Sequence, residues 1–331
     1  MTTPQLLPDR SSPPSSNEPI ALAPSMIEAV SRAHAFAPAA TPIILYGESG
    51  TGKTFFAEYI HELSGRSGGF HAFSVGNLAP QLALDELFGH VRGAFTDARE
   101  NRRGQFAIAG SGTLLLDDVH TLDLSVQKQL LQVLDRGTYS PLGSDRLQTV
   151  VCRIILAMTE NPDRLMQKGQ LLIDLRYRFG ECAIEIPPLR ERRAEIRVYA
   201  ECALRYWAEK THLDGPTAFC DGALALLERS EYRGNVRELE GIVLSAFLLA
   251  RYKGASEIDM EHLPSKLRPS WTYHRHGDRS ANRAAVERAL QMTGGNITNA
   301  AQLLNVSRTT VTAMHRAFIR EDKSGHMATV Q

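Results

Sequence analysis

Residues Gly47-Glu48-Ser49-Gly50-Thr51-Gly52-Lys53-Thr54 fit the pattern G-x-x-x-x-G-K-[ST] at every fixed position. The run 42–46 before them is apolar and partly β-branched, which is typical of a buried strand. Residues 55–63 after them place apolar side chains at helical spacing. Strand, glycine-rich turn and helix are the context in which this pattern binds phosphate, so the sequence predicts a nucleotide-binding loop at 47–54.

The residue types of this loop suit a phosphate chain. Glycines let the backbone curl until several N–H groups point at one phosphate chain, and the helix N-terminus behind them adds partial positive charge. Lys53 can reach the β- and γ-phosphates, and the Thr54 hydroxyl can bind Mg²⁺. All residues of the loop are therefore candidates for binding ATP together with Mg²⁺.

A second apolar run, residues 112–118, ends in Asp117 and Asp118 and has a Walker B pattern. Asp117 is placed to hold Mg²⁺, and Asp118 is placed to orient or deprotonate the attacking water. Strands that end in acids are common, and it is the pairing with an upstream phosphate loop that makes this pattern informative. Further apolar runs at 70–75, 149–157 and 182–186 alternate with helical patterns. They predict an α/β fold with a parallel sheet flanked by helices, and a ligand at the carboxyl ends of the strands.

The chain turns helical after the last of these runs. Apolar stripes at helical spacing fill residues 191–267, whereas the stretch after them is polar and broken by Pro and Gly. The first residues are rich in Pro and Ser, which is typical of a disordered tail. We therefore expect a tail (1–18), an α/β nucleotide-binding domain (19–190), a helical domain (191–267), a linker (268–282), a helix-turn-helix (283–320) and a second tail (321–331).

Three helical patterns fill residues 283–320. A tight turn joins the second to the third, and Ser307 stands where the third helix needs its N-cap. Residues 271–320 hold seven arginines and two acids, a local excess that attracts phosphate. The pattern predicts DNA binding through the third helix, with the candidates Ser307, Arg308, Thr309, Thr310, Thr312 and Arg316. The alternative is a helical cap with no role in DNA binding.

The whole chain carries no net charge, with 37 Lys and Arg against 37 Asp and Glu, so attraction to nucleic acid has to come from such local asymmetry. The four cysteines are scattered without a C-x-x-C pair, which suits a reducing cytoplasm and argues against a zinc site. No apolar run reaches the length of a membrane span, and no signal peptide is visible. We expect a cytoplasmic protein without membrane contact.

Two polar segments have more than one interpretation. Residues 93–98 place Phe95 between small residues, and composition alone favours an ordinary solvated loop. Arg176 and Arg178 lie between the apolar runs 149–157 and 182–186. An arginine here can stabilise transition-state charge on a γ-phosphate, in cis or from a neighbouring subunit, or can form a surface salt bridge.

Taken together, residues 20–320 resemble the sigma-54-dependent bacterial enhancer-binding proteins, which are AAA+ ATPases with a C-terminal Fis-type helix-turn-helix. Besides the phosphate loop at 47–54, the resemblance rests on motifs that occur in the family's order. These are Glu86-Leu87-Phe88-Gly89-His90 with Gly93-Ala94-Phe95-Thr96-Asp97-Ala98, Gly112-Thr113-Leu114-Leu115-Leu116-Asp117-Asp118, Pro187-Pro188-Leu189-Arg190-Glu191-Arg192, Gly234-Asn235-Val236-Arg237-Glu238-Leu239 and Gly294-Gly295-Asn296.

The resemblance implies a mechanism and a set of partners. Such proteins bind upstream DNA and assemble from dimers into rings, usually hexamers, with ATP between subunits. Hydrolysis moves a G-A-F-T-G-A loop that contacts sigma-54 and opens the promoter complex of the polymerase. By this resemblance residues 93–98 form the sigma-factor contact loop, the helical domain is the AAA+ lid, Arg178 is a trans-acting arginine finger and Arg237 is the sensor II arginine.

Several positions depart from the family pattern. The contact loop has Asp97 where the family has Gly, which adds charge and removes backbone freedom. Asp118 stands where the family has Glu and is one methylene shorter, which favours slow hydrolysis. Thr54 instead fits the general Walker pattern better than the acid common in the family. The other departures are Ser74 for the Asn that bonds the Walker B acid, Met158-Thr159 for the Thr-Asn of sensor I, Leu172 for the other arginine finger and Tyr232-Arg233 for Trp-Pro.

The leading hypothesis is an ATP-dependent activator that remodels the sigma-54 polymerase closed complex. The first alternative is a DNA-binding regulator that uses ATP for assembly or switching without remodelling sigma-54. A general AAA+ protein remodeller is a third class, and the helix-turn-helix counts against it. No sensory domain precedes residue 20, so we expect control by expression level or by a regulatory partner protein.

Overall fold

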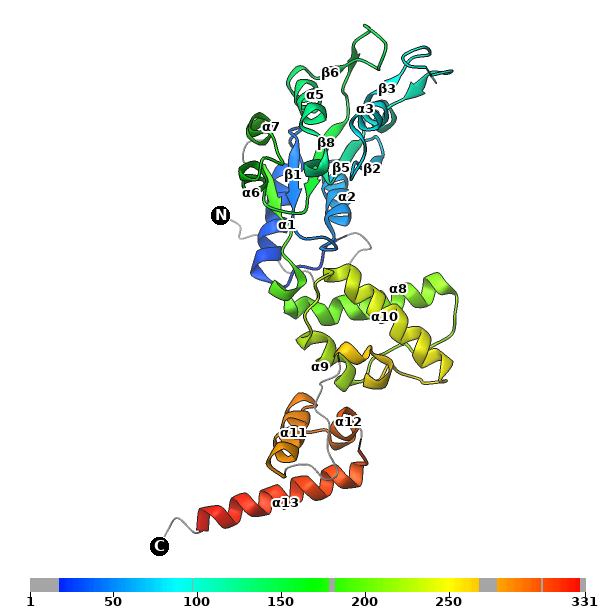
Figure 1. The fold of residues 1–331 in the computed structure, drawn as a ribbon. Helices are drawn as coiled ribbons and strands as arrows, with labels where there is room; N and C mark the ends of the chain where they lie inside the picture. Colours follow the sequence, from blue (N-terminus) through cyan, green and yellow to red (C-terminus); the bar gives the residue numbers. More distant parts are fainter. Residues whose placement is uncertain (1–17, 97, 179–181, 268–278, 305, 328–331) are drawn as a thin grey trace, which may run out of the picture. The chain divides into compact units, whose positions relative to one another are not determined.

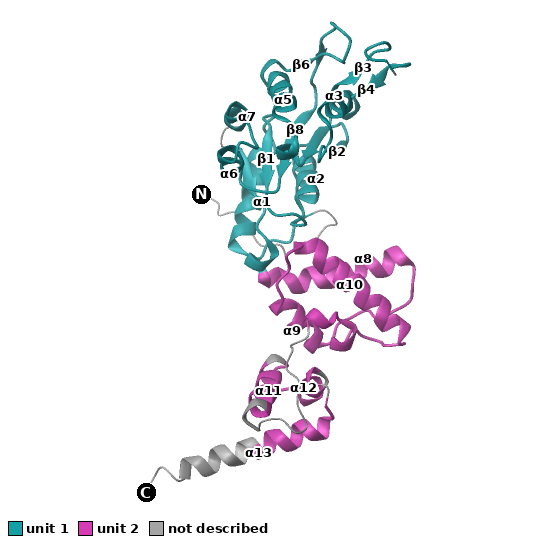
Figure 2. Cartoon of the chain, in the orientation of Figure 1, with its two compact units in different colours: residues 1–192 teal, residues 193–331 magenta. Residues whose placement is uncertain are grey.

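The computed structural model describes residues 18–96, 98–178, 182–267, 279–304 and 306–327 (Figure 1). Asp97, most of the predicted first tail and most of the predicted linker lie outside the described residues. The chain forms two compact units, residues 1–192 and 193–331 (Figure 2). None of the described helices combines the length and the apolar character that crossing a bilayer requires.

The first unit is built on a five-stranded parallel sheet with the strand order β2-β5-β8-β1-β9. Its strands are β1 (Ile43–Tyr46), β2 (Phe70–Ser74), β5 (Thr113–Asp117), β8 (Arg153–Met158) and β9 (Ala183–Glu185). Two antiparallel pairs lie outside this sheet, β3 (Gly89–His90) with β4 (Arg102–Arg103) and β6 (Thr138–Tyr139) with β7 (Gln148–Thr149). The helices are α1 (Pro24–Phe36), α2 (Lys53–Leu63), α3 (Pro80–Phe88), α4 (Gln105–Ala109), η1 (Val119–Thr121), α5 (Leu124–Arg136), α6 (Pro162–Gln167), α7 (Ile173–Arg178) and η2 (Leu189–Glu191).

Helices cover both faces of the sheet because successive strand residues point to opposite sides. Ile43 and Leu45 of β1 pack in one core with α1 and α2, whereas Ile44 packs in a second core with α3 and α5. Each fully buried Leu or Ile of this kind stabilises the fold by about 1.5–3 kcal/mol. The arrangement confirms the α/β class expected from alternating strands and helices.

One predicted strand is wrong in its bounds. The apolar run 149–157 was expected to form a single strand, but Thr149 pairs with Thr138 in the β6–β7 hairpin and β8 begins only at Arg153. Val150 N donates to Gly137 O at 2.8 Å, so the backbone before β8 is bonded to the end of α5 and not to the sheet. A prediction from apolar character alone therefore treated as one strand two elements that have different hydrogen-bond partners.

The second unit is helical. Its first part contains η3 (Arg193–Glu195), α8 (Ile196–Thr211), α9 (Asp221–Arg229), α10 (Asn235–Tyr252), η4 (Met260–His262) and η5 (Ser265–Leu267). Its last part contains α11 (Arg279–Met292), α12 (Ile297–Leu303) and α13 (Arg308–Met327), which share a small core around Val286, Leu304 and Val311. α11 begins earlier than residue 283, and α13 continues past the expected end at residue 320. The helices of residues 193–267, followed by three helices that are joined by short loops, agree with the predicted architecture.

Candidate functional site

The phosphate loop lies between β1 and α2 at the carboxyl edge of the sheet. Gly47 N donates to Met158 O at 3.2 Å, so the loop starts beside the end of β8. Gly50 and Gly52 have φ values of 77° and 99°, in the left-handed region that favours glycine. A Cβ on Gly47 would lie 2.3 Å from Ile186 O, so this position has no room for a side chain. The glycine pattern is thus explained by backbone geometry.

Lys53 and Thr54 occupy the first turn of α2. Lys53 is 7% exposed, and its Nζ donates to Gly47 O at 2.8 Å and to Glu48 O at 3.2 Å across the loop. Thr54 is exposed. Gly52 precedes the helix without a side-chain cap, and the first N–H groups of a helix have no partner within it. This arrangement suits an anion next to Lys53.

Two arginines after β9 hold the loop from outside. Arg190 forms a bidentate pair with Glu48, with nitrogen–oxygen distances of 2.7 and 2.8 Å. Arg192 is 1% exposed and donates to Thr51 O at 2.8 Å. Sequence reasoning placed both arginines in a family motif but gave them no role. In the sequence, the two arginines are marked by their short distance from the end of the last predicted strand. This distance alone does not indicate that they contact the phosphate loop.

Asp117 ends β5, and Asp118 follows in the left-handed region with φ 61°. Asp118 N donates to Asp117 Oδ1 at 2.9 Å, and both residues are half-buried. A Cβ on Gly76 would lie 3.4 Å from Asp118 Oδ2 and 3.5 Å from Ser74 Oγ, so this glycine lies beside both side chains. Ser74 Oγ accepts from Gly76 N, and the described residues show no bond from Ser74 to Asp118. The two acids thus lie at the predicted edge of the sheet.

The residues at the sensor I position form a contact that the sequence did not reveal. Thr159 follows β8, and its Oγ1 lies 2.9 Å from Nε2 of His120 in η1. Burial lowers the pKa of His120, Asp118 opposes this and Lys53 adds to it. A histidine after a pair of acids carries no motif, so sequence reasoning had no reason to single it out.

The arginines of α7 differ in their surroundings. Arg178 is exposed, and its Nε lies 2.9 Å from an Asp135 oxygen. Arg176 is 8% exposed, and its Nε donates to an Asp163 oxygen at 2.8 Å within the same unit. Leu172, at the other finger position, packs against the core of the unit. Of these positions, only Arg178 offers an exposed guanidinium.

Gly93 and Ala98, the two ends of the predicted contact loop, are joined by a backbone hydrogen bond. Gly93 N donates to Ala98 O at 2.8 Å, and Gly93 has φ 87°. Phe95 is 42% exposed and stacks edge-on against His90, with ring centroids 4.9 Å apart. Thr96 is exposed, and Asp97 lies outside the described residues. The loop therefore presents Phe95 and Thr96 to solvent on a defined base.

The β6–β7 hairpin supports this base. Leu142 N donates to Gly89 O at 2.8 Å, and Val91 N donates to Leu142 O at 3.0 Å. A Cβ on Gly143 would lie 2.7 Å from the Ala94 Cβ. The loop and the hairpin are thus joined both by backbone bonds and by close contact.

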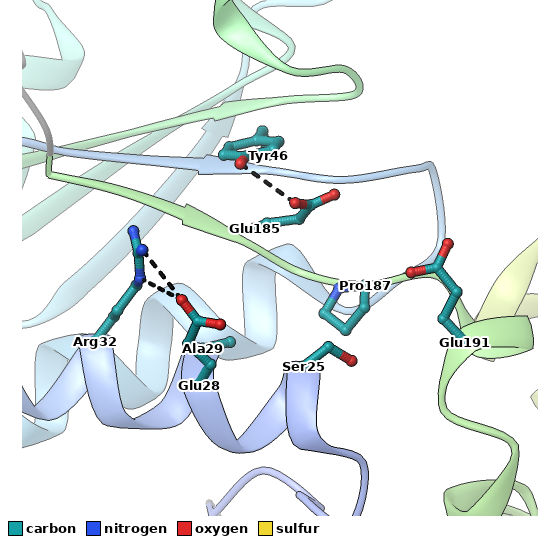
Figure 3. A pocket seen from close by; sticks show the side chains of 8 residues that line it. All are labelled: Ser25, Glu28, Ala29, Arg32, Tyr46, Glu185, Pro187 and Glu191. Carbon is teal, nitrogen blue, oxygen red and sulfur yellow. Dashed lines mark hydrogen bonds and ion pairs between the residues drawn. The ribbon is translucent and has the colours of Figure 1, made fainter.

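A separate hollow of about 170 Å³ lies where β9 meets α1, and Figure 3 shows the side chains around it. Glu28 pairs with Arg32 at 3.1 Å, and Tyr46 Oη donates to Glu185 at 3.3 Å. Glu191 completes its acidic lining. Carboxylates repel phosphate, so this hollow does not compete with the loop 47–54 for the nucleotide's anionic part.

The helix-turn-helix presents most of its predicted contact residues. Ser307 Oγ accepts from Thr310 N at 3.2 Å and so caps α13, while Val311 is buried in the small core. Ser307, Arg308, Thr309 and Arg316 are exposed, and Thr310 and Thr312 are half-buried. Thr312 Oγ1 donates to Arg308 O at 2.9 Å. Arg237 is exposed in the first turn of α10 and belongs to the second unit.

A phosphate loop and two adjacent acids at one edge of a parallel sheet define a P-loop nucleotide-binding protein. The helical second unit and its helix-turn-helix narrow this class to AAA+ proteins that carry a DNA-binding domain.

Comparison with known families gives the more particular assignment. Residues 20–185 match the sigma-54 interaction domain, residues 190–279 match the AAA+ ATPase lid domain, and residues 280–313 match the bacterial regulatory proteins of the Fis family. The chain therefore belongs to the family defined by the sigma-54 interaction domain.

Individual relatives agree with this family. The chain is 34% identical over 287 residues to the transcriptional regulatory protein GlrR of Escherichia coli, which covers 86% of this chain and 64% of GlrR. It is 32% identical over 307 residues to the luminescence regulatory protein LuxO of Vibrio campbellii, which covers 85% of this chain and 65% of LuxO. The chain thus spans less than two thirds of the length of either relative.

A solved structure shares the fold. The crystal structure of NtrX from Brucella abortus in complex with ATP superposes with a TM-score of 0.67. The sequences are 24% identical, and the match covers 91% of this chain and 69% of NtrX.

Proposed function

We propose that the protein is an ATP-dependent activator of sigma-54 transcription that binds upstream DNA. The observation that carries this proposal is the phosphate loop 47–54 beside the Walker B acids, in a chain with a sigma-54 interaction domain and a Fis-type helix-turn-helix. ATP is the ligand that the loop and Lys53 suit. Asp118 orients the attacking water, and Arg237 acts as the sensor II arginine.

Thr54 and Asp117 would hold Mg²⁺. Hydroxyl and carboxylate oxygens are donors that suit this cation; Asp117 ends β5, and Thr54 lies in the first turn of α2, the helix that follows β1 of the same sheet. Bound Mg²⁺ supplies charge neutralisation at the β- and γ-phosphates.

Lys53→Ala should abolish ATP binding, as measured with a fluorescent ATP analogue. An unchanged affinity in this variant would contradict the site.

Assembly into a ring, a hexamer formed from dimers, completes the proposed site. The exposed Arg178 supplies the trans-acting charge for a neighbour's γ-phosphate. ATP turnover per chain should then rise with protein concentration and vanish in Asp117→Ala. Turnover that does not depend on concentration would argue against shared sites.

The sigma-factor contact is assigned to residues 93–98, with Phe95 and Thr96 as the exposed contact residues. Open-complex formation by sigma-54 polymerase on a promoter with its upstream site tests this step. Phe95→Ala should retain ATP turnover and lose open complexes, while loss of both would point to misfolding. A cytoplasmic location and control by a partner protein or by expression level belong to the same proposal.

A second candidate function is a DNA-binding regulator that uses ATP for assembly or switching. Asp118 and the absence of a Ser74–Asp118 bond among the described residues favour it, because both weaken the control of the attacking water. ATP binding and DNA binding without turnover would select this function over sigma-54 remodelling.

A further inference from the structure

Two short strands carry the predicted contact loop. β3 ends at His90 and β4 begins at Arg102, and these two residues are paired directly across the antiparallel ladder. Residues that lie opposite each other in such a pair have their side chains on the same face. Here both side chains bond to one residue of α3, Asp85, and Figure 2 shows α3, β3 and β4 next to one another. Asp85 therefore ties the two strands together at the base of the loop.

Asp85 is a buried carboxylate, 8% exposed, and both of its oxygens have partners. Oδ1 lies 2.6 Å from Nδ1 of His90, and Oδ2 accepts from Nη1 of Arg102 at 3.1 Å. A carboxylate only accepts hydrogen bonds, so the proton of this contact lies on Nδ1 of His90. Arg102 is held in turn by Glu86, whose Oε1 accepts from Nη2 at 2.6 Å. The orientation of the His90 ring is thus fixed from both α3 and β4.

Phe95 of the contact loop rests on this fixed ring. The ring centroids of His90 and Phe95 are 4.9 Å apart and their planes meet at 66°, an edge-to-face arrangement that aromatic pairs favour. The His90 side chain is only 11% exposed, whereas Phe95 is 42% exposed. His90 is therefore too covered to meet a protein partner itself. Phe95 still faces solvent while it contacts His90, so the contact orients Phe95 without hiding it.

We propose that His90 is a positioning residue for the sigma-54 contact: its ring holds Phe95 in the orientation in which Phe95 meets the partner, and Asp85 holds His90. This inference rests on the proposed function and gives a role to two residues outside the contact loop. A side chain that is already ordered loses less conformational freedom on binding, which strengthens the contact. For one ordered side chain the gain is roughly two- to tenfold in affinity.

Two substitutions remove the positioning in different ways. In His90→Asn the amide nitrogen lies near the position of Nδ1 and can keep the bond to Asp85, but the ring that meets Phe95 is lost. In Arg102→Met both rings remain, but Asp85 loses one of its two partners. The Arg102 side chain is 45% exposed, so its replacement leaves the core of the unit in place.

The chain offers a matched control at the amino ends of two sheet strands. His61 Nδ1 lies 2.8 Å from Oγ1 of Thr113, the first residue of β5, and its ring centroid lies 6.0 Å from that of Phe70, the first residue of β2. His61→Asn can keep the Thr113 bond and removes a ring beside a phenylalanine, just as His90→Asn does at the contact loop. It therefore reports the general cost of such a change.

The test makes three measurements on the full chain. Open complexes of sigma-54 polymerase are measured over a series of activator concentrations, and ATP turnover is measured on the same samples. The fluorine NMR signal of 4-fluorophenylalanine incorporated at Phe95 reports the ring contact directly, without any partner. A purely structural role of His90 would change turnover together with open complexes.

His90→Asn should raise the activator concentration for half-maximal open complexes about two- to tenfold and leave ATP turnover per chain unchanged. Its fluorine signal should move towards that of the free amino acid. Arg102→Met should shift both quantities in the same direction but less. His61→Asn should leave open complexes, turnover and the fluorine signal as in the wild type.

An unchanged half-maximal concentration in His90→Asn would overturn the inference, and so would an unchanged fluorine signal. A lower half-maximal concentration would overturn it too, because His90 would then hold Phe95 back from the partner. Should His90→Asn fail to fold, Arg102→Met decides by the same criteria. If the wild-type chain forms no open complexes, the proposed sigma-54 function fails and the role of His90 with it, whatever the fluorine signal shows.

Discussion

Arg178 Nε lies 2.9 Å from an Asp135 oxygen, and the same guanidinium donates to Leu134 O at 3.1 Å. Both side chains of the pair are about half exposed, at 46% and 51%. An ion pair with this exposure is worth at most about 1 kcal/mol because water competes for both charges. Arg178 is therefore held within the chain by a contact weak enough to be replaced by a stronger one.

Removing Arg178 should affect turnover far more than binding. We expect Arg178→Ala to lower kcat by about 10³-fold, the loss typical of a trans-acting arginine, while ATP affinity stays near that of the wild type. Turnover above the concentration of assembly and fluorescent-analogue binding measure the two quantities. Arg164→Ala, at an exposed arginine of the neighbouring α6, is the control and should be active. Equal loss in both variants would count against Arg178.

Removing Asp135 should have the opposite effect on turnover, because it should favour the form of the protein in which Arg178 is active. In Asp135→Asn the guanidinium of Arg178 loses its partner within the subunit, so the concentration needed for half-maximal turnover should fall a few-fold. The free energy of unfolding should change by less than about 1 kcal/mol, because the pair is exposed. A concentration series of ATP turnover, with a urea titration beside it, checks both values. A rise in the half-maximal concentration would mean that Asp135 orients Arg178 and does not compete for it.

Substitutions of the two arginines at the phosphate loop should affect different quantities, one the KM for ATP and the other the stability of the fold. The Arg190–Glu48 pair is exposed, so Arg190→Ala should raise KM for ATP a few-fold with little change in Tm. Arg192 is buried and holds Thr51 O, so Arg192→Met should lower the free energy of unfolding by about 2–4 kcal/mol. Thermal unfolding and steady-state kinetics measure the two effects. A larger loss of Tm in Arg190→Ala than in Arg192→Met would contradict this assignment.

Stability should fall as the solution becomes mildly acidic. Burial lowers the pKa of His61, Glu62 and Glu58 partly oppose this and Arg66 adds to it. The unfolded chain, in which the pKa is about 6.5, thus binds more protons at this residue than the folded chain does as pH drops below that value. The stability that His61 contributes is present above pH 6.5 and is lost as pH falls towards the lowered pKa of the folded state.

His61→Asn isolates this contribution because its amide can keep the bond to Thr113. The difference in unfolding free energy between pH 7.5 and pH 5.5, measured by urea titration, should be smaller in this variant than in the wild type. An equal or larger difference would show that His61 is not a source of the acid sensitivity.

A substitution of Arg316 tests the proposed DNA-binding face of α13. It is exposed on the same helix as Arg308 and Thr309, so Arg316→Ala should weaken DNA binding. If Arg316 contacts a phosphate, the loss is similar for all sequences and the salt dependence of binding falls by about one unit of slope. Titrations at several salt concentrations measure this. Arg288→Ala, at an exposed arginine of α11, serves as the control.

The fold was predictable from the sequence because its decisive features are local. The glycines of the loop, the alternation of Ile43, Ile44 and Leu45 and the N-cap Ser307 each act within a few residues, so their patterns can be read directly. The end of one strand and the start of another at residues 149–153 was not predictable in the same way. That boundary depends on the bond from Val150 to Gly137, and apolar character does not report hydrogen-bond partners.

The site was predictable only as far as its motifs extend. Lys53, Asp117 and Asp118 belong to patterns with fixed spacing. His120 and Arg192 act on residues 39 and 141 positions away along the chain, and nothing in their own neighbourhood marks these contacts. Arg176 illustrates the converse: as a charged residue near Arg178 it looked available, but its bond to Asp163 buries it.

The Leu142 contacts have a mechanical consequence. α5 begins just after the Walker B turn and runs through Gly137 into the β6–β7 hairpin, whose Leu142 is bonded to Gly89 and Val91. A displacement of α5 along its axis therefore pulls on the base of residues 93–98 through two backbone bonds, and the close approach of Gly143 to Ala94 prevents the hairpin from slipping past. We therefore expect that residues inserted into the hairpin would weaken the transmission of such a displacement to the loop.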